Sequence, residues 1–391
     1  MVDCPTRCTP SSTLSQTTCR ACALTARTIE QDLQDKMVLV SGPRQSGKTT
    51  LARALLARRY RTQEQRYLNW DGDEARTRIL AREFPREGVV VFDELHKFSR
   101  WRNFLKGLYD SHHATMRILV TGSARLDLYR RGGDSLQGRY HHLRLYPFSL
   151  REIGCSVADL MALGPFPEPL LSGSVQKARR WSREYRTRLV REDVASLERV
   201  EEMGALEQLS LRLPALVGSP LSLNSLRENL QVAHKTVERW IGIFERLLFI
   251  FRLLPFGPPK IKAVKKSRKH YHFDWTTVTD DGARFENMVG YHLLKECHYQ
   301  EDTEGHDVEL RFFRDVEGRE VDFVQMQNGK ATRFVECNHT DPNASSSLRY
   351  LRRKFPAVEA IQVLAKPGID RIGPLGVRIV SADTFLGELL V

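Results

Sequence analysis

Apolar runs of strand length alternate with helical stretches over the first part of the chain. Residues 37–40, 89–92 and 117–121 are such runs, and each passes into small or polar residues. Residues 25–36 have the spacing of an amphipathic helix, and residues 49–59 also favour a helix. Strands that alternate with helices are typical of a parallel sheet with helical crossovers, so we expect an α/β domain here.

The pattern changes near residue 150 and again near residue 258. The stretch between is mostly helical, and residues 221–248 have the periodicity of a helix, a turn and a second helix, as in winged-helix domains. The last part combines a helix at 285–297 with β-like runs at 310–313, 320–325 and 333–337. These shifts predict four segments: a tail at 1–24, the α/β domain at 25–150, a helical, winged-helix region at 151–258 and an α+β domain at 259–391.

Residues 42–49 read Gly-Pro-Arg-Gln-Ser-Gly-Lys-Thr and fit the phosphate-binding pattern G-x-x-x-x-G-K-[ST] in full. A predicted strand precedes the loop and a predicted helix follows it, so backbone N–H groups and the helix N-terminus would face phosphate oxygens. Lys48 would reach the β- and γ-phosphates, and the Thr49 hydroxyl would contact Mg²⁺. The residues expected to bind ATP are Gly42, Pro43, Arg44, Gln45, Ser46, Gly47, Lys48, Thr49 and Thr50.

The second apolar run ends in two acids, as the partner strand of a phosphate loop does. Asp93 is placed to hold Mg²⁺ through water, and Glu94 to polarise an attacking water, which favours hydrolysis over binding alone. The third run ends in small polar residues, of which Thr121 or Ser123 could sense the γ-phosphate. Arg139 is either a surface residue or, in an oligomer, a finger that neutralises charge on a neighbour's nucleotide.

The composition is that of a globular protein with a basic surface. Hydrophobic residues make up 41% of the 391 residues, which excludes a mostly disordered chain. Lys and Arg number 60 against 48 Asp and Glu, a formal net charge of +12. Such an excess suits nucleic acid but also an ordinary solvated surface. Residues 260–269 carry six Lys or Arg, as an exposed, phosphate-binding hairpin or as a solvated loop.

The chain has no apolar stretch of the roughly 20 residues that a transmembrane helix needs, and its start lacks the apolar run of a secretory signal. We therefore expect a cytoplasmic protein whose thiols are reduced. Four cysteines near the start form two close pairs, which could bind zinc or could be incidental thiols in a tail. The candidate zinc ligands are Cys4, Cys8, Cys19 and Cys22.

The phosphate loop is followed by further motifs in a fixed order. They are Asp-Glu-Leu-His-Lys at 93–97 with Trp101, Thr-Gly-Ser at 121–123, Gly-Arg at 138–139, Leu-Tyr-Pro-Phe-Ser at 145–149, Gly-Pro-Phe-Pro-Glu at 164–168 and Arg-Glu-Asp-Val at 191–194. Together they resemble bacterial and archaeal AAA-type ATPases whose P-loop domain precedes a C-terminal domain of unknown function. The resemblance runs from the phosphate loop to near the C-terminus, which is most of the chain, and the cysteine-rich tail lies outside it. It implies ATP binding and the roles given above to Lys48, Thr49, Asp93, Glu94 and Arg139.

Two later segments carry candidate nucleic-acid chemistry. The second helix of the winged-helix pair would expose a polar face, either to a DNA major groove or to a structural or oligomer contact. Its exposed residues would be His234, Lys235, Glu238 and Arg239.

The last domain has the spacing of a restriction-endonuclease-like site. Glu286 lies on the predicted helix, while Asp322 and Glu336 lie on successive strands and match the metal-binding acids of such folds. Asn338 stands where the catalytic lysine belongs, and it cannot supply that positive charge. The domain is therefore an active nuclease only if a lysine comes from elsewhere, such as Lys295; otherwise it is a degenerate fold used for binding. His339 is a further candidate ligand or a surface residue.

These observations predict an α/β P-loop ATPase, then a helical winged-helix segment, then an α+β nuclease-like domain. We expect an Mg²⁺-dependent ATP hydrolase that couples nucleotide state to a basic C-terminal region able to bind nucleic acid, with a homo-oligomer as a further candidate assembly. Two alternatives remain open. One is a slow ATP-gated DNA-binding or regulatory switch, and the other is an ATP-dependent nuclease in repair or phage defence.

Overall fold

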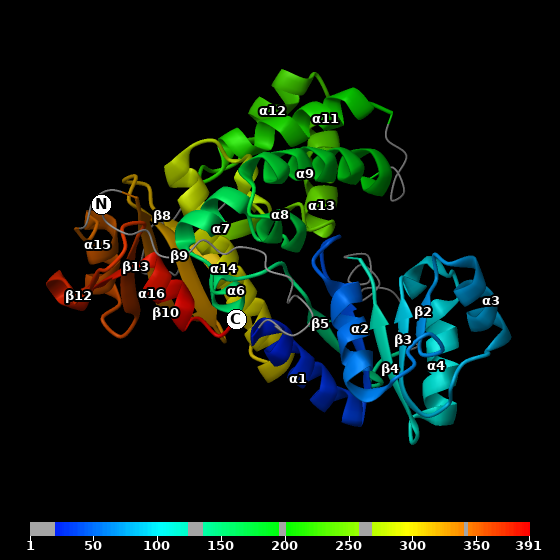
Figure 1. Ribbon diagram of the computed structural model, residues 1–391. Helices are drawn as coiled ribbons and strands as arrows, with labels where there is room; N and C mark the ends of the chain where they lie inside the picture. Colours follow the sequence, from blue (N-terminus) through cyan, green and yellow to red (C-terminus); the bar gives the residue numbers. More distant parts are fainter. Residues whose placement is uncertain (1–19, 124–135, 195–200, 258–267, 340–342) are drawn as a thin grey trace, which may run out of the picture.

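The computed structural model describes residues 20–123, 136–194, 201–257, 268–339 and 343–391, and of residues 20–24 only the backbone. A parallel sheet domain, a helical region and a mixed-sheet domain follow one another along the chain (Figure 1). The predicted order of an α/β domain, helices and an α+β domain is confirmed.

The first domain is a five-stranded parallel sheet in the order β2-β3-β4-β1-β5. Its strands are β1 (Met37–Ser41), β2 (Tyr67–Asn69), β3 (Gly88–Asp93), β4 (Met116–Thr121) and β5 (Tyr140–Arg144). Its helices are α1 (Arg20–Asp35), α2 (Lys48–Arg59), α3 (Asp73–Ala81), η1 (Leu95–Lys97) and α4 (Trp101–His112).

Both faces of this sheet are buried, which explains why its strands are continuously apolar. Because neighbouring side chains on a strand point to opposite faces, Val38 and Val40 pack with α1 and α2, while Met37 and Leu39 pack with α3 and α4. Because β1, β3 and β4 are parallel, their carboxyl ends meet at one edge of the sheet, where the phosphate loop and Asp93 lie.

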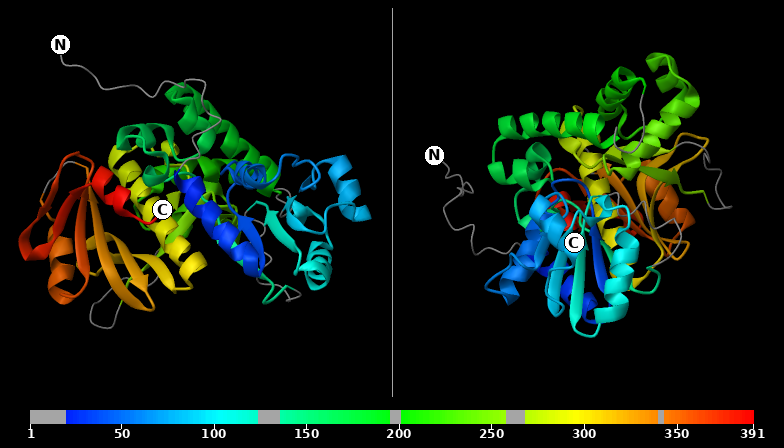
Figure 2. Two further views of the ribbon diagram at one scale, coloured as in Figure 1. Left: turned by 60° about the horizontal axis from the view of Figure 1, so that its bottom comes forward. Right: turned by 90° about the vertical axis from the view of Figure 1, so that its right-hand side faces the viewer.

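The helical region covers that edge of the domain (Figure 2). It contains α6 (Leu150–Ile153), α7 (Val157–Leu163), α8 (Pro167–Ser172), α9 (Val175–Arg188), the π-helical η3 (Leu189–Val194), α11 (Met203–Arg212), η4 (Leu213–Leu216), α12 (Leu223–Leu230) and α13 (His234–Arg246). The predicted helix pair is confirmed as α12 and α13. The predicted polar face is exposed, with His234, Lys235, Glu238 and Arg239 at the surface.

The C-terminal sheet has eight strands in the order β12-β13-β11-β10-β9-β8-β6-β7. The strands are β6 (Ile250–Pro255), β7 (Lys269–His272), β8 (Val308–Arg314), β9 (Glu320–Gln327), β10 (Lys330–Asn338), β11 (Glu359–Leu364), β12 (Asp370–Ile372) and β13 (Arg378–Ser381). The helices are η5 (Trp275–Thr277), α14 (Asp281–Glu304), α15 (Ser346–Lys354), η6 (Pro374–Gly376) and α16 (Ala382–Glu388).

The β6–β7 hairpin follows the helical region in sequence but belongs to the C-terminal sheet, because β6 pairs with β8. The basic run lies in this hairpin, and residues 258–267 are outside the described part. The basic run was expected to be exposed, and for its last residue this is wrong. Lys269 is the first residue of β7, and its side chain is 0% exposed.

Helix α14 lies between the first domain and the C-terminal sheet in Figure 1 and in the left view of Figure 2. Arg144, at the end of β5, donates from Nε and Nη2 to Asp302 on α14 at 2.9 and 2.6 Å. On the other side of the helix, a Cβ at Gly290 would lie 2.6 Å from the Phe323 ring, so only glycine permits this approach to β9. Among the described helices, none combines the length and the apolar character that crossing a membrane requires.

Candidate functional site

The phosphate loop connects β1 to α2, and its two glycines are required by geometry. A Cβ at Gly42 would lie 2.1 Å from the carbonyl oxygen of Leu145, so no other residue fits against the segment after β5. Gly47 has φ +94°, a left-handed conformation that side-chain-bearing residues rarely adopt. The loop thus turns tightly into α2, with Lys48 as the first residue of the helix.

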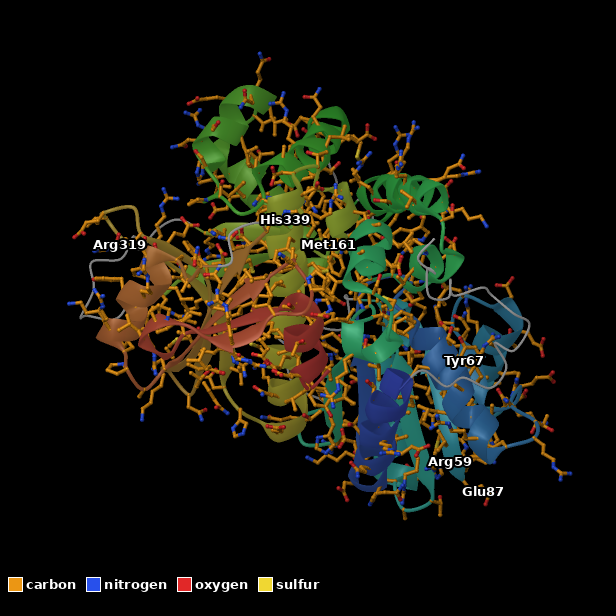
Figure 3. All side chains as sticks on the ribbon, turned by 60° about the vertical axis from the view of Figure 1, so that its left-hand side comes forward. Arg59, Tyr67, Glu87, Met161, Arg319 and His339 are labelled. Carbon is orange, nitrogen blue, oxygen red and sulfur yellow. The ribbon has the colours of Figure 1, made fainter. Side chains whose placement is uncertain are left out.

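Asp93 is the centre of the predicted metal-binding edge. Its Oδ2 accepts from the Thr49 hydroxyl at 2.9 Å, and its Oδ1 accepts from the Thr121 hydroxyl at 2.5 Å. A third donor is the hydroxyl of Tyr67, on β2, which also bonds Oδ2. Burial and the hydrogen bond to Asp93 raise the pKa of Tyr67, so it remains a donor. Tyr67 is labelled in Figure 3 on the first domain.

Thr49 and Asp93 fit a magnesium ion, since a hydroxyl and a carboxylate oxygen converge there from adjacent elements. Of the two candidate phosphate sensors, Thr121 and Ser123, the first donates its hydroxyl to Asp93. Tyr67 was not predicted, because its role depends on β2 lying beside β3, which no local pattern shows.

The Lys48 ammonium is buried and folded back onto its own loop. Its Nζ donates to the carbonyl oxygens of Pro43 at 2.6 Å and Gly42 at 3.1 Å. Burial lowers the pKa of Lys48 to about 8, although the nearby charges of Glu94 and Asp93 oppose this shift. The side chain can exchange these carbonyls for phosphate oxygens, which would favour its charged form.

Glu94 follows β3 with φ 56°, so its backbone turns away from the strand. Its carboxylate lies 3.2 Å from the Lys97 Nζ and 3.8 Å from the His96 Nε2, and its side chain is 22% exposed. The Ser123 hydroxyl lies 3.4 Å from the same His96 nitrogen. Glu94 and Ser123 are therefore neighbours at the edge where the phosphate loop ends, as predicted for residues near the γ-phosphate.

The phosphate loop also contacts the helical region. Arg44 places Nη2 2.8 Å from the Asp193 carboxylate and Nη1 3.6 Å from that of Glu192, both on η3. Pro167, the first residue of α8, would lie 4.0 Å from a Cβ at Gly47. The nucleotide-binding loop is thus in contact with two elements of the helical region.

The acids of the nuclease-like spacing lie on three neighbouring elements of the C-terminal domain. Glu286 lies on α14, Asp322 on β9 and Glu336 on β10, and Asp322 accepts a hydrogen bond from the Cys337 amide at 2.9 Å. Burial and then the charges of Asp322 and Glu286 raise the pKa of Glu336.

The lysine of this cluster is not the one suggested by the sequence. Lys295 donates to the Pro147 carbonyl at 2.9 Å and pairs with Glu152, so it ties α14 to α6 instead. Lys269 occupies the cluster, with its Nζ 3.2 Å from Glu286. His339 is exposed and borders a cavity of about 570 Å³ that Met161 also lines (Figure 3).

Comparisons with known proteins agree with this arrangement. A family model described as an AAA domain matches residues 34–154. Two models described as domains of unknown function, DUF8612 and DUF4143, match residues 156–278 and 281–377. The chain joins an AAA-type P-loop domain to C-terminal domains of unknown function.

Similar proteins extend this likeness without naming an activity. An uncharacterised protein of Mycobacterium tuberculosis is 27% identical over 236 residues, covering 60% of this chain and 53% of that protein. One of Methanocaldococcus jannaschii is 22% identical, covering 69% of this chain and 70% of that protein. The chain spans about half the length of the mycobacterial relatives it matches.

Solved structures align only remotely with this chain. A Walker-type ATPase of Pyrococcus abyssi aligns with a TM-score of 0.42 and 16% identity, covering 66% of this chain and 94% of that one. An Aeropyrum pernix ORC1 protein in complex with DNA aligns with a TM-score of 0.30 and 13% identity, covering 69% and 91%. Likeness at this level carries no argument about ligands or partners.

Arg139 lies at the opposite end of the AAA sheet from the phosphate loop. Its carbonyl accepts from the amide of Met37, at the start of β1, whereas the loop follows the end of that strand. Its Nε donates to Asp110 at 2.7 Å. Arg139 therefore cannot act on the nucleotide of its own domain, and the finger role stays a prediction for an oligomer only.

The candidate zinc ligands are the four cysteines near the start of the chain. Cys4, Cys8 and Cys19 lie outside the described residues, and for Cys22 only the backbone at the start of α1 is described. Within the described part of the chain, no group of three or more His, Cys, Asp or Glu is arranged to hold a metal ion.

Protonation of Lys48 is expected to couple to ATP binding by the AAA domain. Below its pKa of about 8 the free protein already carries the ammonium, so the Kd for ATP should change little with pH. Above that pH, binding must take up a proton, and the Kd should rise by up to about tenfold per pH unit. Calorimetric ATP titration from about pH 7 to about pH 9.5, in buffers of different ionisation enthalpy, measures both the Kd and the proton uptake.

Lys48→Arg is the matched control, because a guanidinium stays charged over this range. Where this variant binds ATP, its Kd should be flat with pH. A flat wild-type profile without proton uptake would contradict the lowered pKa.

Proposed function

We propose that this protein binds ATP with Mg²⁺ in its AAA domain, hydrolyses it, and passes the nucleotide state to the helical region and the C-terminal domain. The observation that carries the proposal is the oriented Asp93 carboxylate, held by Thr49, Thr121 and Tyr67 at the end of the phosphate loop. The first relatives are longer than this chain, so the activity of a whole protein of this kind is part of the proposal.

Each residue of the site has a distinct task. The phosphates would lie against the loop amides and the N-terminus of α2, and Lys48 would move from its backbone carbonyls to the phosphate oxygens. Thr49 and Asp93 would hold the magnesium ion, which neutralises charge on the phosphates. Glu94 would orient the attacking water and accept its proton, with Ser123 nearby to contact the γ-phosphate.

Replacing Glu94 by Gln separates binding from turnover. The amide keeps the size of the side chain but cannot accept the proton, so kcat should fall by about 10²- to 10⁴-fold. The Kd for ATP should stay within about threefold of wild type, because the loop is intact. Lys48→Ala is the companion variant and should lose tight ATP binding. Unchanged turnover in Glu94→Gln would refute its role as the base.

The contact between Arg44 and Asp193 supports coupling to the helical region. Phosphates entering the loop would compete for the Arg44 guanidinium, because Arg binds phosphate as well as carboxylate. Asp193 would then lose its ion pair with the loop. The buried Tyr185 hydroxyl has no hydrogen-bond partner among the described residues. Burial raises the pKa of Tyr185, and the nearby charge of Asp193 raises it further, so Tyr185 and Asp193 lie close together. An exchange of the Asp193 partner from Arg44 to Tyr185 would thus signal to η3 that nucleotide occupies the phosphate loop.

Asp193→Asn tests this coupling. In the wild type, ATP with Mg²⁺ should change the hydrogen-exchange protection of residues 189–194, because η3 loses its partner on the loop. In Asp193→Asn the change should largely disappear while ATP still binds. Glu184→Gln, which removes an exposed acid of α9, is the control and should behave as wild type. No nucleotide-dependent change in the wild type would exclude η3 as the coupling element.

A basic face on α9 favours a nucleic-acid partner for the helical region. This helix leads directly into η3, and its buried side packs Trp181 and Tyr185 against Phe166. Its exposed side carries five cations and one acid, Glu184. The exposed cations are Lys177, Arg179, Arg180, Arg183 and Arg188. Such a row of cations suits a phosphate backbone, and its connection to η3 would let ATP modulate the binding.

Neutralising this face should weaken DNA binding in a salt-dependent manner. For Arg179→Gln with Arg183→Gln, the slope of log K against log salt should fall by up to about 2 for duplex DNA, since each lost phosphate contact removes about 0.9. Arg353→Gln with Lys354→Gln, on exposed positions of α15, is the matched control and should keep the wild-type slope. Equal slopes in both variants would favour the alternative, a switch that acts on a protein partner.

A further inference from the structure

The acidic cluster of the C-terminal domain already contains a cation supplied by the chain. Lys269 extends from the start of β7 into the space between α14 and β9, and its side chain is 0% exposed. Its Nζ lies 3.2 Å from the Glu286 carboxylate and 3.6 Å from that of Asp322, and it pairs with Glu320 as well. Asp322 is one of the two acids expected to bind a divalent metal, and Glu286 is the helix acid of the nuclease-like spacing.

The ammonium is poorly placed to share this space with a metal ion. A magnesium ion needs carboxylate and water oxygens at about 2.0–2.1 Å in a near-octahedral arrangement. Here the oxygens of Glu286 and Asp322 face a lysine nitrogen, which donates a hydrogen bond to Glu286 and forms an ion pair with Asp322 at 3.6 Å. If the Lys269 ammonium moved away from these acids, it would be a buried charge without a partner, because the side chain has no exposed surface.

The cluster is also closed from the helical region. The loop after η4 passes over α14 so tightly that a Cβ at Gly218 would lie 3.0 Å from Glu286 Oε2. Pro220 forms a β-bridge with Lys269, and the amide of Leu221 donates to the Arg268 carbonyl at 2.8 Å. On the inner side, the Tyr271 hydroxyl donates to Glu286 Oε1 at 2.6 Å. A phosphodiester would have to displace this loop to reach the acids.

We propose that the Lys269 ammonium permanently replaces the divalent metal of the nuclease-like site, so that the C-terminal domain is a closed, non-cleaving scaffold. The ammonium joins three segments that are distant in sequence: the hairpin that follows the helical region, the helix α14 and the strand β9. In a metal-dependent nuclease these acids would hold an exchangeable ion, whereas here they hold a side chain that fastens the β6–β7 hairpin to α14 and β9.

Titration of the full-length protein with Mn²⁺, without nucleotide and followed by electron paramagnetic resonance, tests this proposal. The wild type and Asp322→Asn should bind Mn²⁺ identically, because Asp322 is committed to Lys269. Lys269→Met, which keeps the length of the side chain but removes the charge, should gain a site at least about tenfold tighter than any in the wild type. That site should disappear again in Lys269→Met with Asp322→Asn.

Lys269→Arg is the charge-preserving control and should gain no site, since the guanidinium still neutralises the acids. Linear duplex DNA incubated with the wild type and Mn²⁺ should stay intact.

Three results would overturn the proposal. They are a wild-type Mn²⁺ site that is lost in Asp322→Asn, Asp322-dependent cleavage of DNA, or a folded Lys269→Met that gains no site. If Lys269→Met does not fold, the comparison of the wild type with Asp322→Asn still decides the question. Identical binding then supports the proposal, and a difference refutes it.

Discussion

The buried helix α14 is the constraint on which the arrangement of the three parts depends. Most residues from Phe285 to Cys297 are buried, so each polar side chain on the helix needs a partner inside the protein. Asn287 exchanges two hydrogen bonds with the backbone of His272, at 2.7 and 2.8 Å. Lys295 pairs with Glu152 on α6. Breaking such a buried ion pair costs about 3–5 kcal/mol, because the remaining charge is left without a partner.

These contacts leave only certain elements free to respond to a nucleotide. The AAA sheet is fastened to α14 through β5, where Arg144 binds Asp302 with two nitrogens. The phosphate loop follows β1 at the same end of the sheet, since Ser41 pairs with Arg144 in the parallel ladder. Its contacts to the helical region include an ion pair to η3 and the approach of Pro167. An ion pair with one half-exposed partner can change at modest cost, so movement is easiest at η3 and hardest at α14.

The sequence predicted the parts of the site that follow one another along the chain. The phosphate loop, Asp93 and Glu94 were identifiable because a strand, a loop and a helix give local patterns, and β3 repeats the same apolar signal. Tyr67 could not be predicted, since its role comes from the pairing of β2 with β3. The same holds for Arg44, whose partner Asp193 lies far along the chain on a π-helical segment. In the C-terminal domain, the acids were predicted from their spacing, but the cation was sought on α14, and it comes from β7.

Under the proposals made above, Lys48 serves a binding site whereas Lys269 closes one, and the surroundings of the two lysines explain the difference. Both side chains are removed from water, which disfavours the ammonium in each case. For Lys48 burial prevails and lowers its pKa, because the groups that accept its hydrogen bonds are neutral backbone carbonyls. For Lys269 burial also opposes the charge, but the carboxylates of Glu286, Asp322 and Glu320 outweigh it and raise the pKa. An anion such as a phosphate therefore improves the surroundings of Lys48, whereas Lys269 has its counter-charges already and gains nothing from a ligand.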